Sequence, residues 1–211
     1  MMKKILFSII FLSILFISST YADPLIFVKE YNFLGKAFNF DSYSTIISST
    51  ELLNEKLLLD DALNKLNLKN KKNGVLFSLK LADIEFPLEQ KIYKERIYNQ
   101  AYHLRITNKE ILIEAPSKIG VFYGVQSFLQ ILNSYSKLPE VDIKDCPDLP
   151  MRMIMVDPAR QNENFDYYRR LIKFCGKNKI NFIQFHLTDH QTSVYNFREM
   201  HAFHQKILKN I

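Results

Sequence analysis

The chain has 211 residues, a mean hydropathy of −0.11 and a formal net charge of +6. Loss of Lys3 and Lys4 with a leader lowers that charge to +4, which is too mild to indicate a nucleic-acid partner. Two cysteines do not make a disulfide framework, and five glycines without a phosphate-cradling loop argue against nucleotide-binding folds.

The N-terminus has the pattern of a secretory leader. Two lysines precede the uncharged apolar run 5–17, and Thr20-Tyr21-Ala22 supplies a small-x-small cleavage site. We expect a signal peptide over residues 1–22 and a secreted or periplasmic protein that leaves the membrane after cleavage. The alternative, a retained anchor, is disfavoured because spanning a bilayer takes about 20 apolar residues.

Residues 23–140 predict a compact α+β domain with an antiparallel sheet and helices. Ser48 followed by Glu51 resembles a capping box, which predicts a helix beginning there. Its apolar face comprises Leu52, Leu59, Leu63 and Leu66. Strands are expected at the apolar stretches 25–28, 36–40 and 75–80.

A hairpin and a second helix complete this domain. Segments 101–106 and 111–115 alternate in polarity around the short connection 107–110, as the arms of a hairpin do. Residues 121–133 carry apolar side chains at helical spacing. With no catalytic cluster among these elements, the domain is interpreted as a packing module.

The proline-rich segment 139–150 is typical of a domain linker. Beyond it, apolar segments 152–156 and 182–187 flank an amphipathic segment 166–177, for which Asn164 or Asp166 is a candidate cap. Nearly continuous apolar strands are typical of parallel sheets covered on both faces. The pattern predicts a right-handed β-α-β unit, as found in barrels and doubly wound sheets.

Polar side chains follow both predicted strands of this unit. Asp157 and Arg160 follow the first, and His186 and Asp189 end the second, so all four are expected at one sheet edge. A guanidinium fork donates to two oxygens at fixed separation, which suits vicinal hydroxyls. The alternative is an internal Asp157–Arg160 ion pair that closes the strand–helix loop.

Metal and disulfide chemistry are both weakly indicated. The histidines at 186, 190, 201 and 204 lack a Cys or acid that completes a known ligand spacing, so we expect no metal or other cofactor. Cys146 and Cys175 either pair or remain buried thiols, and the sequence leaves both alternatives open.

Taken together, these motifs resemble the glycoside hydrolase family 20 β-N-acetylhexosaminidases over most of the chain. The first domain is similar to their accessory domain, and the second to the opening of their catalytic barrel. The matched positions are 102–106, 111–115, 120–130, Arg152, Asp157, Arg160, Lys179, Asn181, His186, Asp189 and Gln191.

The resemblance implies a substrate and residue roles. Arg160 would bind hydroxyls of a terminal N-acetylhexosamine on a glycan, and Asp189 would be a supporting carboxylate in catalysis. In this family the substrate's own acetamido oxygen attacks the anomeric carbon, so the reaction is a substrate-assisted exception to the two-carboxylate scheme. A later Asp-Glu pair holds the acetamide and protonates the leaving oxygen.

The sequence also departs from the family pattern. Met153, Gln161 and His190 replace a Gly, a His and an Asp, and after Asp189 the only acid is Glu199. We therefore expect residues 151–211 to form the first β-α-β unit of a truncated TIM (β/α)8 barrel, poorly ordered and inactive alone. A barrel needs roughly 250 residues.

Several origins remain open for such a chain. It is expected to be a truncated or split gene product, with a partner chain that completes the barrel as one alternative. A secreted carbohydrate-binding or interaction protein without catalysis is the alternative from another class. A relative acting on different sugars is the third.

Overall fold

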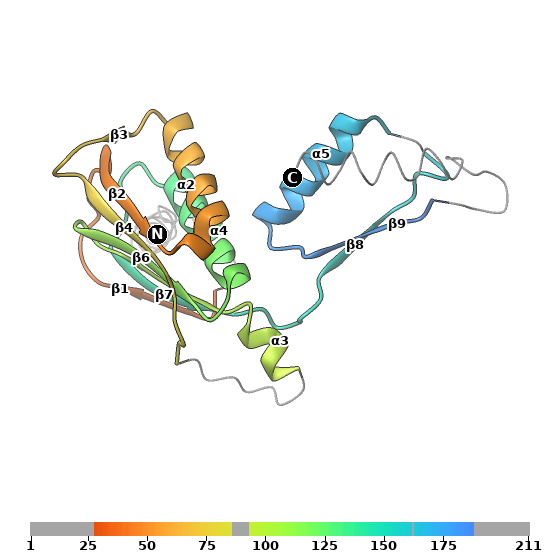
Figure 1. Cartoon of the computed structure of the whole chain (residues 1–211), viewed down its shortest axis with the longest axis horizontal. Helices are drawn as coiled ribbons and strands as arrows, with labels where there is room; N and C mark the ends of the chain where they lie inside the picture. The colour runs from red at the N-terminus through yellow and green to blue at the C-terminus, as the bar shows by residue number, and fades with distance from the viewer. Residues whose placement is uncertain (1–27, 86–92, 162, 188–211) are drawn as a thin grey trace, which may run out of the picture.

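The computed structural model describes residues 28–85, 93–161 and 163–187 (Figure 1). The expected signal peptide, Asp189 and the histidines at 190, 201 and 204 lie outside these ranges. Within them, no helix has the length and apolar character that a membrane crossing requires.

The first unit is built on a seven-stranded sheet in the order β1-β7-β5-β6-β4-β2-β3. Its strands are β1 (Glu30–Phe33), β2 (Ser42–Ser48), β3 (Lys69–Asn70), β4 (Val75–Leu81), β5 (Tyr102–Ile106), β6 (Glu110–Ala115) and β7 (Val141–Asp145). The predicted hairpin is confirmed as the antiparallel pair β5–β6. The expectation of an antiparallel sheet is wrong for the other half, because β4 runs parallel to both β6 and β2. Helix α2 (Leu53–Lys65) lies between β2 and β4 in the chain and supplies the crossover that a parallel pair needs.

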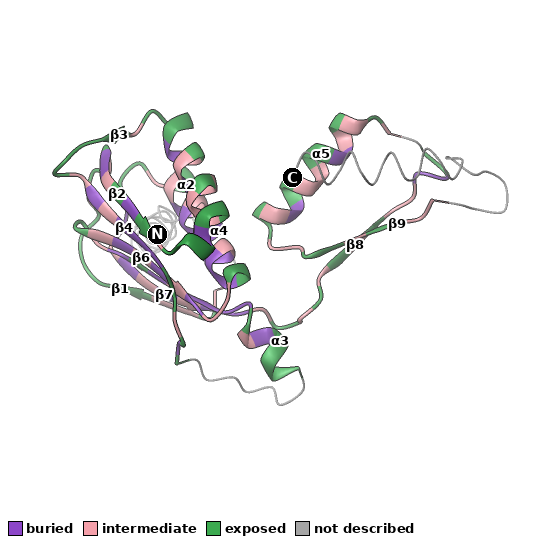
Figure 2. Ribbon diagram, viewed as in Figure 1, coloured by how far each residue is buried: buried purple, intermediate pink, exposed green. Residues whose placement is uncertain are grey.

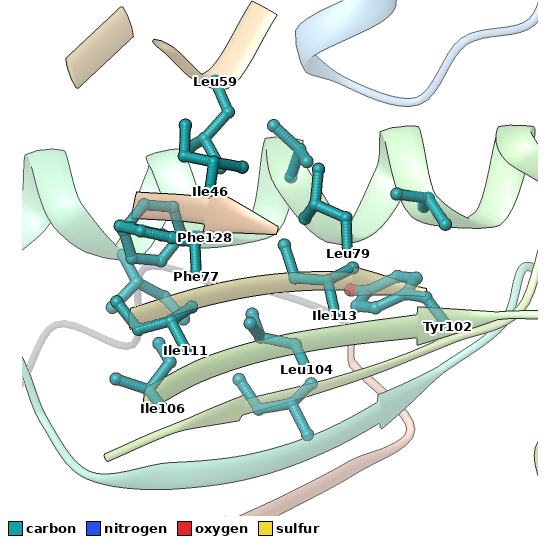
Figure 3. Close-up of a cluster of buried hydrophobic side chains, with 14 of the residues drawn as sticks. Ile46, Leu59, Phe77, Leu79, Tyr102, Leu104, Ile106, Ile111, Ile113 and Phe128 are labelled. Atoms are coloured by element: carbon teal, nitrogen blue, oxygen red, sulfur yellow. The ribbon is translucent and has the colours of Figure 1, made fainter. Parts of the chain in front are cut away.

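The main core lies between this sheet and helices α2 and α4 (Lys118–Ser134) (Figure 3). Phe77 of β4 and Phe128 of α4 are both fully buried, with ring centroids 5.3 Å apart. A Cβ at Gly124 would lie 2.5 Å from Ile113 Cγ2, so only glycine lets α4 lie this close to β6. A short helix, α3 (Lys94–Tyr98), packs at the end of the sheet through Ile97.

The start of α2 differs from the prediction. Ser48 is the last residue of β2 and pairs with Leu79, so it does not cap the helix. The chain enters α2 through a 3-10 turn, Thr50–Leu52, and Ser49 makes no side-chain capping bond. Of the predicted apolar face, Leu52, Leu59 and Leu63 are fully buried, whereas Leu66 is exposed at the C-terminal end.

The expected linker 139–150 contains β7, which pairs with both β5 and β1. Val141 and Ile143 are fully buried and alternate with polar side chains, as in a strand that turns one face toward the core. The interpretation of this segment as a linker is therefore wrong for 141–145. Its acidic side chains obscured a short amphipathic strand.

The second unit comprises β8 (Met153–Val156), α5 (Phe165–Lys177) and β9 (Phe182–Phe185). The predicted β-α-β order is present, and β8 and β9 pair in parallel. Asn164 is the cap of α5, since its side chain accepts a hydrogen bond of 2.9 Å from Tyr167 N.

Little of this unit is buried (Figure 2), and exposed residues alternate with partly buried ones along both strands. Tyr168 of α5 is buried and contacts Phe185 of β9, with ring centroids 5.6 Å apart. The opposite strand face is open, because Met153, Met155 and Phe182 are 48%, 62% and 50% exposed. The strands were expected to be covered on both faces, and that is wrong for the described residues because α5 covers only one.

Candidate functional site

The loops after β8 and β9 lie beside each other. His186 N donates to Val156 O at 2.8 Å, and Ala159 N donates to His186 O at 3.3 Å. These bonds bring Asp157, Arg160 and His186 to the same edge of the two-stranded sheet. Asp189, the fourth residue predicted there, lies outside the described residues.

Asp157 organises the turn that presents Arg160. Its backbone carbonyl accepts from Arg160 N at 3.3 Å and from Gln161 N at 3.2 Å, and its Oδ1 accepts from Arg160 N at 3.2 Å. The guanidinium Nε lies 3.3 Å from Asp157 Oδ2, so the ion pair considered as the alternative is formed. The Arg160 side chain nevertheless remains 75% exposed. An ion pair this exposed contributes roughly 0–1 kcal/mol, so exchanging it for other acceptors costs little.

The described part of the chain also shows how its metal-ligating residue types and its two cysteines are arranged. No group of three His, Cys, Asp or Glu side chains there is placed to hold a metal ion. Cys146 and Cys175 are both buried and both free, so they form no disulfide. Burial, reinforced by the negative charge of Asp145, raises the pKa of Cys146 to about 11, and burial also raises that of Cys175.

A polar cluster that the sequence did not reveal lies at the opposite end of the strands, where β8 begins. Arg152 donates from Nη2 to Gln100 Oε1 at 2.8 Å and to Tyr123 Oη at 3.0 Å. Its Nε donates to Lys179 O at 2.7 Å and its Nη1 to Leu149 O at 2.7 Å. The guanidinium also lies over the Tyr123 ring, 5.5 Å from its centroid. One side chain of the second unit thus contacts the turn after α3 and helix α4.

Lys179 makes a second connection between the units, before β9. Its Nζ donates to Tyr102 Oη at 2.8 Å and to Asp145 Oδ2 at 2.9 Å. Tyr102 Oη also donates to Asp145 Oδ2 at 2.9 Å and lies 2.6 Å from Ser127 Oγ. Burial lowers the pKa of Lys179 although Asp145 opposes the shift, and burial raises the pKa of Tyr102 well above its usual value.

Asn181 closes this interface. Its side-chain oxygen accepts from Arg152 N at 2.8 Å, and its Nδ2 donates to Pro150 O at 2.9 Å. Asn181 Nδ2 also lies 3.3 Å from Gln100 Oε1, so Arg152, Lys179 and Asn181 all contact the first unit, at the end of β8 and β9 remote from Arg160. Their partners come from distant segments, and no sequence spacing connected them.

Comparisons with known proteins agree with this architecture. The model for glycosyl hydrolase family 20, domain 2, matches residues 27–146, which is more than half of the chain. The β-hexosaminidase subunit B1 of Dictyostelium discoideum is 30% identical over 172 residues, covering 75% of this chain and 29% of that protein. The N,N'-diacetylchitobiase of Vibrio harveyi is 35% identical over 91 residues, or 42% of this chain and 10% of that protein.

Solved structures show the same fold. The family 20 exo-β-N-acetylglucosaminidase of Vibrio harveyi, in complex with N-acetylglucosamine, has a TM-score of 0.62 at 23% identity. The match covers 81% of this chain and 26% of that one. The β-N-acetylhexosaminidase of Streptomyces coelicolor has a TM-score of 0.60 at 20% identity, over 77% of this chain and 34% of that one. The chain spans about a third or less of each of these relatives, and it belongs to glycosyl hydrolase family 20.

Proposed function

We propose that this chain is the N-terminal portion of a secreted or periplasmic β-N-acetylhexosaminidase-like glycoside hydrolase. Residues 23–140, extended through β7, would be its accessory domain, and 151–211 the first β-α-β unit of a (β/α)8 barrel. The observation that carries this proposal is the parallel pairing of β8 and β9 around α5, with Arg160 and His186 at the carboxyl edge. That edge is where barrel enzymes place their active sites.

Arg160 is the proposed sugar-binding residue. Its guanidinium is exposed at this edge, and its ion pair with Asp157 lies at the surface. Vicinal hydroxyls of a terminal N-acetylhexosamine would take two donors of the fork. Asp157 would then keep its role in the turn, because its backbone carbonyl holds the loop independently of the ion pair.

Asp189 is the proposed supporting carboxylate, three residues beyond His186 in the chain. These 211 residues contain no Asp-Glu pair after Asp189 that could act as the proton donor. We therefore propose that this chain alone binds the sugar without hydrolysing it. The rest of the barrel, whichever polypeptide carries it, would supply the acid.

Sugar binding is tested by titrating the full chain with N-acetylglucosamine, followed by NMR or calorimetry. Arg160→Ala should weaken binding roughly 10- to 100-fold, as expected for hydrogen bonds to a charged group. Arg169→Ala is the matched control, because Arg169 pairs with Asp166 three residues away, as Arg160 does with Asp157. Equal affinity of the wild type and Arg160→Ala would refute the role of Arg160.

Hydrolysis is tested separately with a chromogenic N-acetylglucosaminide. The wild-type chain should release no chromophore above the buffer rate, because it lacks a paired acid. Turnover that disappears in Asp189→Asn would contradict the proposed inactivity. Sugar binding without turnover is also the outcome expected of a carbohydrate-binding protein, and restored turnover on adding a barrel-completing chain would distinguish the enzyme portion from it.

A further inference from the structure

Two helices of this protein end in the same backbone motif. After α2, Leu68 N donates to Leu63 O at 3.1 Å and Asn67 N to Asn64 O at 2.9 Å. After α5, Ile180 N donates to Cys175 O at 2.9 Å and Lys179 N to Gly176 O at 3.2 Å. Both are Schellman motifs, in which one residue beyond the helix adopts a left-handed conformation.

The residues at the left-handed position differ. Asn67 has a φ of 56° and Lys179 a φ of 58°. Glycine, and secondarily asparagine, suits this conformation, whereas other residues incur backbone strain there. The backbone therefore explains Asn67 and does not explain Lys179.

The contacts of the Lys179 side chain explain why a lysine occupies this position. From this turn it reaches Tyr102 on β5 and Asp145 at the end of β7, both nearly inaccessible to solvent. Its Nζ also lies 4.7 Å from the centroid of the Tyr102 ring. Asp145 has no other cation within hydrogen-bonding distance among the contacts of the described residues.

We propose that Lys179 is an interdomain anchor, whose ammonium, held between Asp145 and Tyr102, fixes the β-α-β unit against the seven-stranded unit. The inference rests on the fold alone and is independent of sugar binding at Arg160. Arg152 makes the adjacent polar contact, and Gln130 of α4 donates to Lys177 O at 2.8 Å on the same side of α5. Together, these polar contacts fix the orientation of one unit against the other.

A buried ion pair orients more than it stabilises. Desolvation of two charges offsets much of their attraction, so replacing both by neutral groups is often harmless. Removing one partner leaves the other charge buried without compensation, which is strongly destabilising. The anchor therefore predicts strong non-additivity between positions 145 and 179.

The test is hydrogen–deuterium exchange of the full chain, read on peptides of β8, α5 and β9 and, as reference, of β5 and β6. Lys179→Gly removes the backbone strain together with the ammonium, and Asn67→Gly is the matched control at the same motif. We expect exchange in the second unit to rise at least about 100-fold in Lys179→Gly. Asn67→Gly should change exchange less than about threefold, since Asn and Gly both suit the position.

Further variants keep the test decisive if the single change unfolds the unit. Lys179→Met/Asp145→Asn should return exchange to within about tenfold of the wild type, and Lys179→Met alone should not. The alkylation rate of Cys175, buried on α5, provides a second readout of the same opening.

Three outcomes would overturn the proposal. Exchange in Lys179→Gly that is unchanged or slower would show that only backbone strain mattered at this position. Equal acceleration in β5 and β6 would show global destabilisation rather than loss of docking. If the effects of Lys179→Met and Asp145→Asn on exchange, each measured singly, added up in the double variant, the pair would not act as one contact.

Discussion

The two units of this protein are ordered by different means. The seven-stranded unit has its own core, in which Phe77, Phe128 and Ile113 are fully buried. In the second unit, the only buried hydrophobic residues among those described are Ala159, Tyr168 and Cys175, and the outer strand face is exposed. Polar contacts made by Arg152, Lys179 and Asn181 join it to the first unit. An apolar core stabilises without direction, whereas hydrogen bonds and ion pairs specify orientation.

The largest expected effect is a loss of stability in the core of the first unit. Phe128→Ala removes a ring packed against Phe77 and should lower the free energy of unfolding by about 3–5 kcal/mol. Urea denaturation followed by circular dichroism measures this loss. Phe174→Ala is the control, because that ring is 56% exposed on α5 and its loss should cost within about 0.5 kcal/mol. Similar losses for both rings would contradict the contrast between the units.

An effect of intermediate size is the pH dependence of stability that comes from Cys146. The folded pKa of Cys146 is about 11 against an ordinary 9.0, so folding favours the neutral thiol. The unfolded thiol ionises first as pH rises, and stability is therefore lost between about pH 9 and pH 11, with its full contribution present below pH 9. The full difference corresponds to about 2.7 kcal/mol, and solvent screening lowers the expected size to about 1–2 kcal/mol.

The measurement is the urea midpoint at several pH values for the wild type and Cys146→Ala. Other alkaline groups titrate in both proteins, so only the difference between the two curves reports Cys146. That difference should diminish with rising pH across this window. A constant difference would contradict the raised pKa.

The smallest effect concerns the cap of α5. Asn164→Ala removes the acceptor for Tyr167 N and should cost about 1 kcal/mol, seen as faster amide exchange in the first turn of α5. Ser49→Ala is the control, since Ser49 makes no side-chain capping bond and its loss should be nearly silent. Equal effects at the two positions would show that the capping bond does not stabilise α5.

Patterns that repeat along one element were predictable. The β5–β6 hairpin, α4 and the β-α-β order follow from local periodicity, because each element must present one apolar face. Strand β7 was missed, since its Asp142, Lys144 and Asp145 resemble a polar linker until β1 and β5 pair with it. The parallel pairing of β4 with β2 and β6 was also missed, because no local pattern shows which strand lies beside another.

The candidate site also has features that the local sequence predicts and others that depend on tertiary contacts. By itself, the sequence placed Arg160 and His186 after two strands of one β-α-β unit, and a shared edge follows from that order. Only the tertiary structure decided that Arg160 pairs with Asp157 at the surface, and that Arg152 and Lys179 join the two units. Those contacts connect segments up to 77 residues apart, as between Lys179 and Tyr102. Periodicity determines which face of an element is buried, whereas partners across a domain interface are chosen only when the separate elements pack together.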